Sequence, residues 1–287
     1  MLKRNSIFIL GAALLVATAS CNNPSKIEQA REALREYAAK ETKADSPRTT
    51  RHKKESPQTL DISNESLASQ VNNGIMLNRT AYAVCYNAKA LLPHWVAWTL
   101  TADHTNGKYS RGGIKFQEDE DVPAPRATDA DYRSSGYDRG HICPSGDNKW
   151  SEDAQRESFL FTNICPQGHN LNAGDWNEME QQCRRWAERY GKIYIVSGPV
   201  LYKKKHKTIG RNKVVVPEAF FKVVLRLGDD PKAIGFIYKN EDGNRPKGDY
   251  VNSVDQVERI TGIDFFPTLP DQLEQRVEAT AEWGDWE

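Results

Sequence analysis

The chain has 287 residues, of which 38% are hydrophobic and 27% are charged, so it is long enough and apolar enough to bury a globular core. Its 39 basic residues balance its 39 acidic residues, which excludes a strongly cationic field over the whole molecule. Any binding of nucleic acid must therefore depend on a local basic patch.

The first segment is typical of a secretory signal. Lys3 and Arg4 precede a short apolar run, IFILGAALLVATAS (7–20), and Cys21 follows. The run is shorter than the roughly 20 residues that a membrane-spanning helix needs. Its ending, ATASC, resembles a bacterial lipoprotein signal, although Thr18 stands where that pattern more often has Leu. We expect residues 1–21 to be a lipoprotein-type signal peptide and the protein to be exported and anchored to a bacterial membrane through lipidated Cys21.

Residues 22–60 are polar and charged, with few large apolar side chains, which predicts a flexible stalk. Residues 61–287 are expected to fold. Short runs rich in Val, Ile, Tyr, Phe and Trp predict strands there. These runs are 81–87, 94–101, 159–164, 192–201, 219–227 and 232–240. Several strands with few helices between them favour an α+β fold with a central, largely antiparallel sheet and flanking helices.

Three segments predict helices. Apolar residues recur at three- and four-residue intervals over 172–191, with Asn172 as the N-cap and Gly191 as the stop. Residues 253–261 and an acidic C-terminal segment, 270–283, are also predicted to be helical. Glu180 lies on the apolar face of the first helix, where a carboxylate needs a partner. An interior salt bridge and a role in chemistry are both compatible with this position.

Four cysteines follow Cys21, and the even number in an apparently exported chain predicts disulfides of open connectivity. They are Cys85, Cys143, Cys165 and Cys183. A zinc site built from HIC (141–143), CPQGH (165–169) and Cys183 is the alternative, but the spacing does not match the usual C-x2-C pattern.

The stretch YDRGHICPSGD (137–147) allows two interpretations when taken alone. It is either a polar turn, in which Asp138 and Arg139 form an ion pair, or a site at which His141 accepts a proton from water.

The surrounding motifs favour the second interpretation. SGYDRGHICPSGD (135–147) is preceded by YSRGGIKF (109–116) and followed by FTNICPQGHNLNAGDWNEME (161–180). The ordered parts are DRGH, TN-x-x-PQ, LN-x-G-x-W and a glutamate eight residues after the asparagine. Over roughly residues 80–270 the sequence resembles the DNA/RNA non-specific endonuclease family, the endonuclease G-like ββα-metal (His-Me finger) nucleases.

The resemblance implies a ββα-metal catalytic motif inside a nuclease domain that spans residues 61–287. In this motif His141 corresponds to the general base, and Asn172 to the protein ligand of a single Mg²⁺ or Mn²⁺. Glu180 corresponds to the acid that orients the metal's water molecules. Mg²⁺ prefers oxygen ligands and keeps several waters, so one asparagine is sufficient protein contact.

The resemblance also assigns four supporting residues. Asn163 matches a site asparagine, Arg111 an arginine that stabilises the transition state, and Arg139 an arginine that faces phosphate. Asp138 is expected to shape the turn that carries His141. Guanidinium groups suit these roles because their forked donors match phosphate oxygens.

The function implied by the resemblance is metal-dependent hydrolysis of phosphodiester bonds in DNA and RNA, and a homodimer is compatible with it. The competing hypotheses are a non-catalytic, nucleic-acid-binding surface lipoprotein of the same fold and a zinc-stabilised binding module. The basic stretch 202–213 is either a phosphate track or a solvated loop. The acidic run EDED (118–121) has no assigned role.

Overall fold

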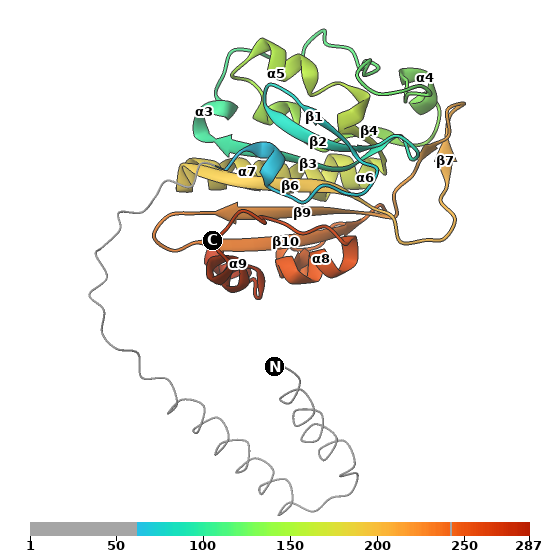
Figure 1. The fold of residues 1–287 in the computed structure, drawn as a ribbon. Helices are drawn as coiled ribbons and strands as arrows, with labels where there is room; N and C mark the ends of the chain where they lie inside the picture. Colours follow the sequence, from blue (N-terminus) through green and yellow to red (C-terminus); the bar gives the residue numbers. More distant parts are fainter. Residues whose placement is uncertain (1–61, 242) are drawn as a thin grey trace, which may run out of the picture. The chain divides into compact units, whose positions relative to one another are not determined.

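The computed structural model describes residues 62–241 and 243–287. Its centre is a seven-stranded sheet in which every pair of neighbouring strands is antiparallel (Figure 1). In spatial order the strands are β1 (Ile75–Asn78), β2 (Tyr82–Asn87), β3 (Leu92–Thr101), β6 (Lys192–Val200), β9 (Ala219–Arg226), β10 (Lys232–Lys239) and β11 (Val251–Asn252). The predicted α+β class and antiparallel sheet are confirmed.

The sheet separates two hydrophobic cores because successive side chains of a strand point to opposite faces. On β9, Phe220 and Val224 enter one core, whereas Phe221 and Val223 enter the other. Helix α7 (Asn177–Tyr190) covers the first face and buries Met179 and other apolar side chains there. Helices α8 (Val254–Thr261) and α9 (Asp271–Glu278) lie beside β10 and cover the second face (Figure 1).

The remaining elements are short. The short helices are α3 (Ala102–Thr105), α4 (Asp129–Tyr132), α5 (Glu152–Glu157) and α6 (His169–Leu171). Two small ladders join β4 (Asp138–His141) to β5 (Ile164–Gln167) and β7 (Thr208–Ile209) to β8 (Val214–Val215). Single 3-10 turns occur at Asn64–Ser66, Ser145–Asp147, Phe161–Asn163, Lys247–Tyr250 and Trp283–Trp286.

The predicted helix over 172–191 begins later than expected. Residues Asn172–Trp176 form a widened turn in which Gly174 has a non-helical backbone (φ −100°, ψ −111°), so the regular helix starts at Asn177. Asn172 itself has helical angles, and its side chain does not cap the helix. The predicted C-terminal helix ends at Glu278 rather than at 283.

The predicted strand over 159–164 is also displaced. Phe161–Asn163 forms a 3-10 turn, and the strand β5 begins only at Ile164. The strongly apolar composition of this segment reflects its burial rather than an extended backbone, since Phe159, Phe161 and Ile164 all lie in the protein interior.

The predicted disulfides are not supported, because all four described cysteines are free and buried. Cys85 lies in the core on the α8 and α9 side of the sheet, whereas Cys143, Cys165 and Cys183 lie in the core on the α7 side. Burial raises the pKa of each thiol, to about 12 for Cys183. A high thiol pKa disfavours the thiolate that zinc requires, which also argues against the zinc site.

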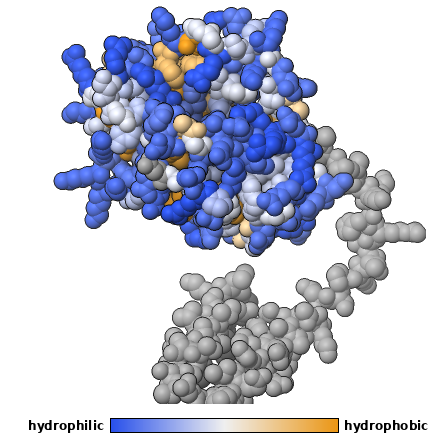
Figure 2. Space-filling view, turned by 180° about the vertical axis from the view of Figure 1, so that it is seen from behind, coloured by the Kyte–Doolittle hydropathy of each residue, from blue (hydrophilic) through white to orange (hydrophobic). Residues whose placement is uncertain are grey.

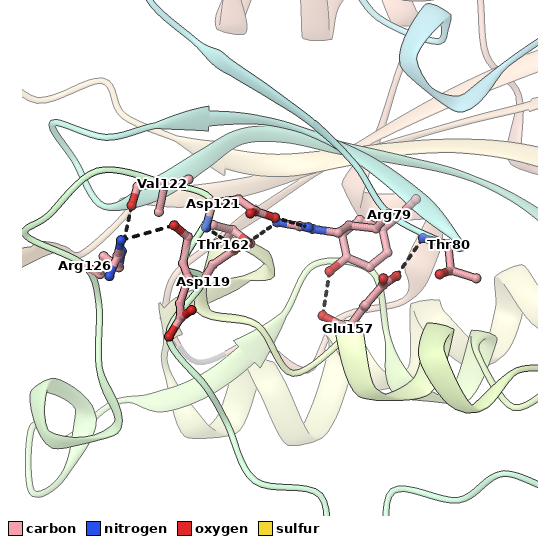
Figure 3. A network of polar contacts seen from close by, with 10 residues as sticks. Arg79, Thr80, Asp119, Asp121, Val122, Arg126, Glu157 and Thr162 are labelled. Carbon is pink, nitrogen blue, oxygen red and sulfur yellow. Dashed lines mark hydrogen bonds and ion pairs between the residues drawn. The ribbon is translucent and has the colours of Figure 1, made fainter.

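The acidic run 118–121 is part of an internal ion-pair network (Figure 3). Arg79, in the turn between β1 and β2, contacts Asp119 and Asp121 at 2.6 Å each. Asp119 is buried and also accepts a hydrogen bond from Thr162 at 2.5 Å. Glu157, at the end of α5, accepts a bond from the backbone of Thr80 in the same turn. The run therefore fastens the loop after α3 to the edge of the sheet.

The face of the described part that Figure 2 shows is mostly hydrophilic. Among its large hydrophobic side chains, Leu201, Tyr202 and Ile260 are the exposed ones. Within residues 62–241 and 243–287, no helix has the length and apolarity required to cross a membrane. The predicted signal peptide (1–21) and stalk (22–60) lie outside the described residues.

Candidate active site

The DRGH sequence forms a strand rather than a polar turn. It is β4, which pairs with β5 so that Asp138 lies opposite Gln167 and His141 opposite Ile164. A Cβ atom on Gly140 would lie 2.7 Å from Cβ of Gln167, so the close approach of the two strands requires glycine at this position. The strand fixes the directions of Asp138, Arg139 and His141.

A cleft of about 450 Å³ lies at this strand and contains five of the predicted site residues. They are Arg111, Arg139, His141, Asn172 and Glu180. The strand β4, the widened turn before α7, α7 itself and the loop after α3 each contribute to the lining. The cleft therefore gathers five predicted residues that are separated by up to 69 positions in the sequence. Asp138 and Asn163 do not line it.

His141 is held between aromatic rings. The Phe116 ring centroid lies 5.4 Å from the imidazole, and the Phe159 ring meets it edge-on at 4.9 Å. Its Nε2 is buried and makes no hydrogen bond to the described residues. Burial, followed by the positive charge of Arg111, lowers the pKa of His141 from 6.5 to about 3. The imidazole is therefore neutral near pH 7 and able to accept a proton.

Asn172 is oriented by Asp138. Asp138 Oδ2 accepts a hydrogen bond from Asn172 Nδ2 at 2.9 Å and contacts His169 Nδ1 at the same distance. A carboxylate accepts but does not donate, so the NH₂ end of the amide must face Asp138. The oxygen of Asn172, the atom that a hard cation prefers, is left as an acceptor for the cleft. Asp138 thus orients the amide of Asn172, a contact that the predicted shaping of a turn does not include.

Glu180 makes no ion pair or hydrogen bond with the described residues, so the interior salt bridge is not formed. Burial raises the pKa of Glu180 from 4.5 to about 7, whereas the positive charges of Lys222 and Arg184 lower it. A carboxylate without a partner at the wall of a polar cleft is suited to hold a cation or its water molecules. Asn172 and Glu180 together supply the oxygen donors that Mg²⁺ or Mn²⁺ prefers, so the residues fit such a metal.

Lys222 is a residue of this region that the sequence analysis missed. It is fully buried on β9, and Nζ lies 4.4 Å from the Trp176 ring centroid and 5.0 Å from that of Trp98. Nζ has no hydrogen-bond partner among the described residues. The signal was a cation in the middle of the apolar run AFFKVVL, at a position that faces α7. The positive charge of Lys222 lowers the pKa of Glu180.

Arg184 was also missed, although it follows Glu180 by one helical turn and lines the cleft. Its Nη1 contacts Asp147 Oδ1 at 2.9 Å, and the other carboxylate oxygen accepts a bond from Trp98 Nε1 at 3.1 Å. Asp147 is buried, and burial raises its pKa despite the nearby charge of Arg184. This pair anchors α7 to the loop that follows His141.

The two predicted arginines differ in their freedom. Arg139 is half-buried, contacts Asp129 Oδ1 at 2.7 Å and lies over the Phe116 and Tyr132 rings. Arg111 is exposed, lies over the Phe159 ring and forms no ion pair within the described residues. Arg111 is therefore the arginine whose guanidinium can move to meet a phosphate group, whereas Arg139 is held in place.

Asn163, the predicted site asparagine, does not line the cleft. It is completely buried, its Oδ1 accepts from the Cys143 backbone N–H, and its Nδ2 donates to the carbonyls of Cys143 and Ser158. Every bond is between 2.8 and 2.9 Å. Because the amide is fully used, Asn163 acts by holding the backbone two residues after His141.

A family model described as DNA/RNA non-specific endonuclease matches residues 60–272. The chain belongs to this family. Members of this family are nucleases, which hydrolyse phosphodiester bonds and generally depend on divalent metals. The resemblance inferred from DRGH and its neighbouring motifs is thereby confirmed.

Relatives within the DNA/RNA non-specific endonuclease family include mitochondrial nuclease EXOG of Xenopus laevis, which is 35% identical over 206 residues. The match covers 66% of this chain and 57% of the frog protein. Mitochondrial endonuclease G of Homo sapiens is 31% identical over 206 residues, covering 67% of this chain and 69% of the human protein. The chain thus spans a little over half of the frog relative and about two thirds of the human one.

A solved structure of the EndoG/EndoGI complex contains a chain with the same fold. It aligns with a TM-score of 0.65 and 29% sequence identity, covering 69% of this chain and 88% of that chain. That structure concerns the mechanism of EndoG inhibition. The likeness supports the α+β architecture of the family around the cleft described above.

These relatives correct the expected location. The sequence predicted an exported protein anchored to a bacterial membrane, whereas the named EXOG and endonuclease G proteins are mitochondrial nucleases. The predicted location is therefore wrong. Its basis was the apolar run before Cys21, a pattern that several kinds of targeting segment share.

Proposed function

We propose that this chain is a divalent-metal-dependent, non-specific endonuclease that hydrolyses phosphodiester bonds of DNA and RNA, with His141 as the general base. The observation that carries the proposal is the meeting of a neutral histidine, an oriented asparagine and an unpaired glutamate in one cleft. Mg²⁺ is the preferred metal and Mn²⁺ the substitute, because both accept oxygen ligands and retain water.

The chemistry assigned to the chain's own residues begins at His141. Its ring nitrogen at the cleft takes a proton from a water molecule as that water attacks phosphorus in line with the leaving oxygen. The aromatic packing of the ring keeps the imidazole neutral before the reaction. The phosphate that enters the cleft carries a negative charge. This charge offsets the effect of Arg111 on the pKa of His141 and stabilises the protonated histidine that forms during attack.

Asn172 and Glu180 would hold the metal, with Asp138 fixing the amide of Asn172. When bound, the metal supplies positive charge against the phosphate and the departing oxygen. Arg111, and to a lesser extent the ion-paired Arg139, would stabilise charge on the other phosphate oxygens. All these contacts are to phosphate and none reads a base, which supports cleavage with little sequence preference.

The basic stretch 202–213 supports a path for the nucleic-acid backbone next to this cleft. Lys207 Nζ lies 4.7 Å from the Tyr137 ring centroid and 3.3 Å from its hydroxyl. Tyr137 directly precedes β4. Lys203, Lys204 and Lys205 are exposed in the loop before β7, where they are free to follow phosphates.

Plasmid nicking by the full chain tests the proposal. Wild-type protein should convert supercoiled plasmid to nicked and linear forms with Mg²⁺, degrade single-stranded RNA, and stop on addition of EDTA. His141→Ala should lower the rate by at least about 100-fold while leaving nucleic-acid binding intact. A wild-type rate in His141→Ala would show that another group is the base. If the chain binds DNA but does not cleave it in the presence of any divalent metal tested, the non-catalytic nucleic-acid-binding alternative is supported instead.

A further inference from the structure

We infer that the side of the sheet opposite the cleft carries a second cation site, formed by Asp255 and Glu258 of α8 and Glu278 of α9. These three residues, the carboxylate cluster, would bind a hard divalent cation, with Ca²⁺ as the best fit. The site goes beyond the proposed nuclease function, because none of its residues lines the cleft.

The first observation is the geometry of the carboxylate cluster. One oxygen from each of the three carboxylates lies within 4.8 Å of the other two. Two oxygens on opposite sides of a Ca²⁺ ion, each bound at about 2.4 Å, are separated by about 4.8 Å. The three groups therefore lie close enough to bind one ion together, with water filling the other positions.

The second observation is independent of the spacing. Glu278 has only 5% of its surface exposed, and its Oε1 is buried without a hydrogen-bond partner among the described residues. A buried carboxylate oxygen with no partner costs free energy unless a ligand satisfies it. This oxygen belongs to the carboxylate that closes the cluster from the α9 side.

The local electrostatics add to that cost. Burial, and then the charges of Glu258, Glu274, Asp255 and Asp264, raise the pKa of Glu278 to about 9. Each named charge is negative. Glu278 is also the last residue of α9, where the helix dipole disfavours an acid. A bound cation would offset this repulsion.

The fold holds the cluster firmly. Ser253 caps α8, and Asp255 and Glu258 follow at a three-residue spacing that places them on one side of the helix. Val254 and Val257 are buried on the adjacent face of this helix, and Val277 buries α9 in the same core. The donor set contains oxygen atoms alone, which favours Ca²⁺ over softer ions such as Zn²⁺. Three carboxylates in an irregular arrangement also suit Ca²⁺ better than Mg²⁺, which demands octahedral geometry.

The test compares Ca²⁺ binding in variants that separate the two sites. Full-length Asn172→Ala, which lacks the proposed active-site ligand, is freed of metal with EDTA, dialysed and titrated with CaCl₂ by calorimetry. It should bind one Ca²⁺, and Asn172→Ala with Glu278→Gln should bind none. Glu274→Gln in place of Glu278→Gln is the matched control, because it removes a neighbouring acid outside the cluster and should keep the ion.

Thermal unfolding gives a second measurement. CaCl₂ at a hundredfold excess over its dissociation constant should raise the Tm of Asn172→Ala by on the order of 5 °C and leave the double variant unchanged. If Glu278→Gln does not fold, Glu258→Gln replaces it. If Ca²⁺ binds equally to all variants and shifts the Tm of each by the same amount, the inference is overturned. A proton, rather than a metal, would then neutralise Glu278. Neither outcome depends on whether the chain cleaves nucleic acid.

Discussion

Asp138 Oδ2 accepts a hydrogen bond from Asn172 Nδ2 at 2.9 Å, and this one contact leaves the amide oxygen of Asn172 for the cleft. The two residues lie 34 positions apart and come from β4 and from the widened turn before α7. The widened turn thus places Asn172 beside β4. A regular helix that began with Asn172 as its N-cap would not need this contact.

The first prediction concerns this contact. Asp138→Asn should raise the Mg²⁺ concentration for half-maximal cleavage by about 10- to 100-fold, since asparagine can donate as well as accept and no longer fixes the amide of Asn172. Plasmid cleavage measured over a Mg²⁺ series gives this value. His169→Ala, which removes the other partner of Asp138, should change it little. A wild-type Mg²⁺ requirement in Asp138→Asn would refute the orienting role.

The second prediction separates chemistry from stability at Glu180. Glu180→Gln should lose about 100-fold or more of the cleavage rate with Mg²⁺ while remaining folded. The pKa of Glu180 is raised from 4.5 to about 7, so the folded state binds more protons than the unfolded state between these values. The free energy of unfolding of metal-free wild type therefore falls as pH rises from about 4.5 to about 7, whereas the Glu180→Gln variant does not show this fall.

The measurement is Tm in EDTA at pH 5 and pH 8 for both proteins. Glu180→Gln should be at least as stable as wild type at pH 8. A variant that is unfolded at both pH values would instead support a structural salt bridge.

The third prediction uses Lys222, whose charge opposes the effect of burial on Glu180. Lys222→Met removes that charge from below the cleft, so the pKa of Glu180 should rise further. The acidic limb of the kcat/KM profile should then move to higher pH, with activity at pH 6 reduced by up to about tenfold and recovered near pH 8. Lys232→Met, on the neighbouring strand and paired with Asp285, is the control. A uniform loss at every pH would assign Lys222 a packing role alone.

The fourth prediction concerns Asn163, which forms three buried hydrogen bonds and does not line the cleft. Asn163→Ala should lower the free energy of unfolding by about 3 kcal/mol, because backbone groups of Cys143 and Ser158 lose their partners. Urea denaturation measures this change. Exposed Asn106→Ala should cost less than about 0.5 kcal/mol. Unchanged stability with lost activity would return Asn163 to the list of residues that meet substrate.

The large strands could be predicted because their composition is unambiguous. The runs 192–201, 219–227 and 232–240 become β6, β9 and β10 with shifts of at most one residue at either end. Their β-branched and aromatic side chains fit a sheet that is buried on both faces. Family motifs, rather than periodicity, identified the five residues that meet in the cleft.

Other features depend on contacts that a local pattern does not contain. DRGH is polar and looked like a turn, yet it becomes β4 because β5 offers a partner strand more than twenty residues later. Gly174 interrupts the helical pattern by its backbone angles, which periodic side chains do not reveal. Lys222 becomes part of the site region because strand alternation directs it toward α7, and that direction follows only from the position of β9 in the sheet.

The two ion pairs of Arg79 respond differently to ionic strength. Asp119 has 3% of its side chain exposed and Asp121 has 64%, so added salt screens the Asp121 contact far more than the Asp119 contact. The loop that carries Arg111 therefore stays attached at salt concentrations that already weaken the contacts between arginine or lysine side chains and phosphate. High salt should therefore inhibit the proposed nuclease activity by releasing nucleic acid, with the architecture of the cleft intact.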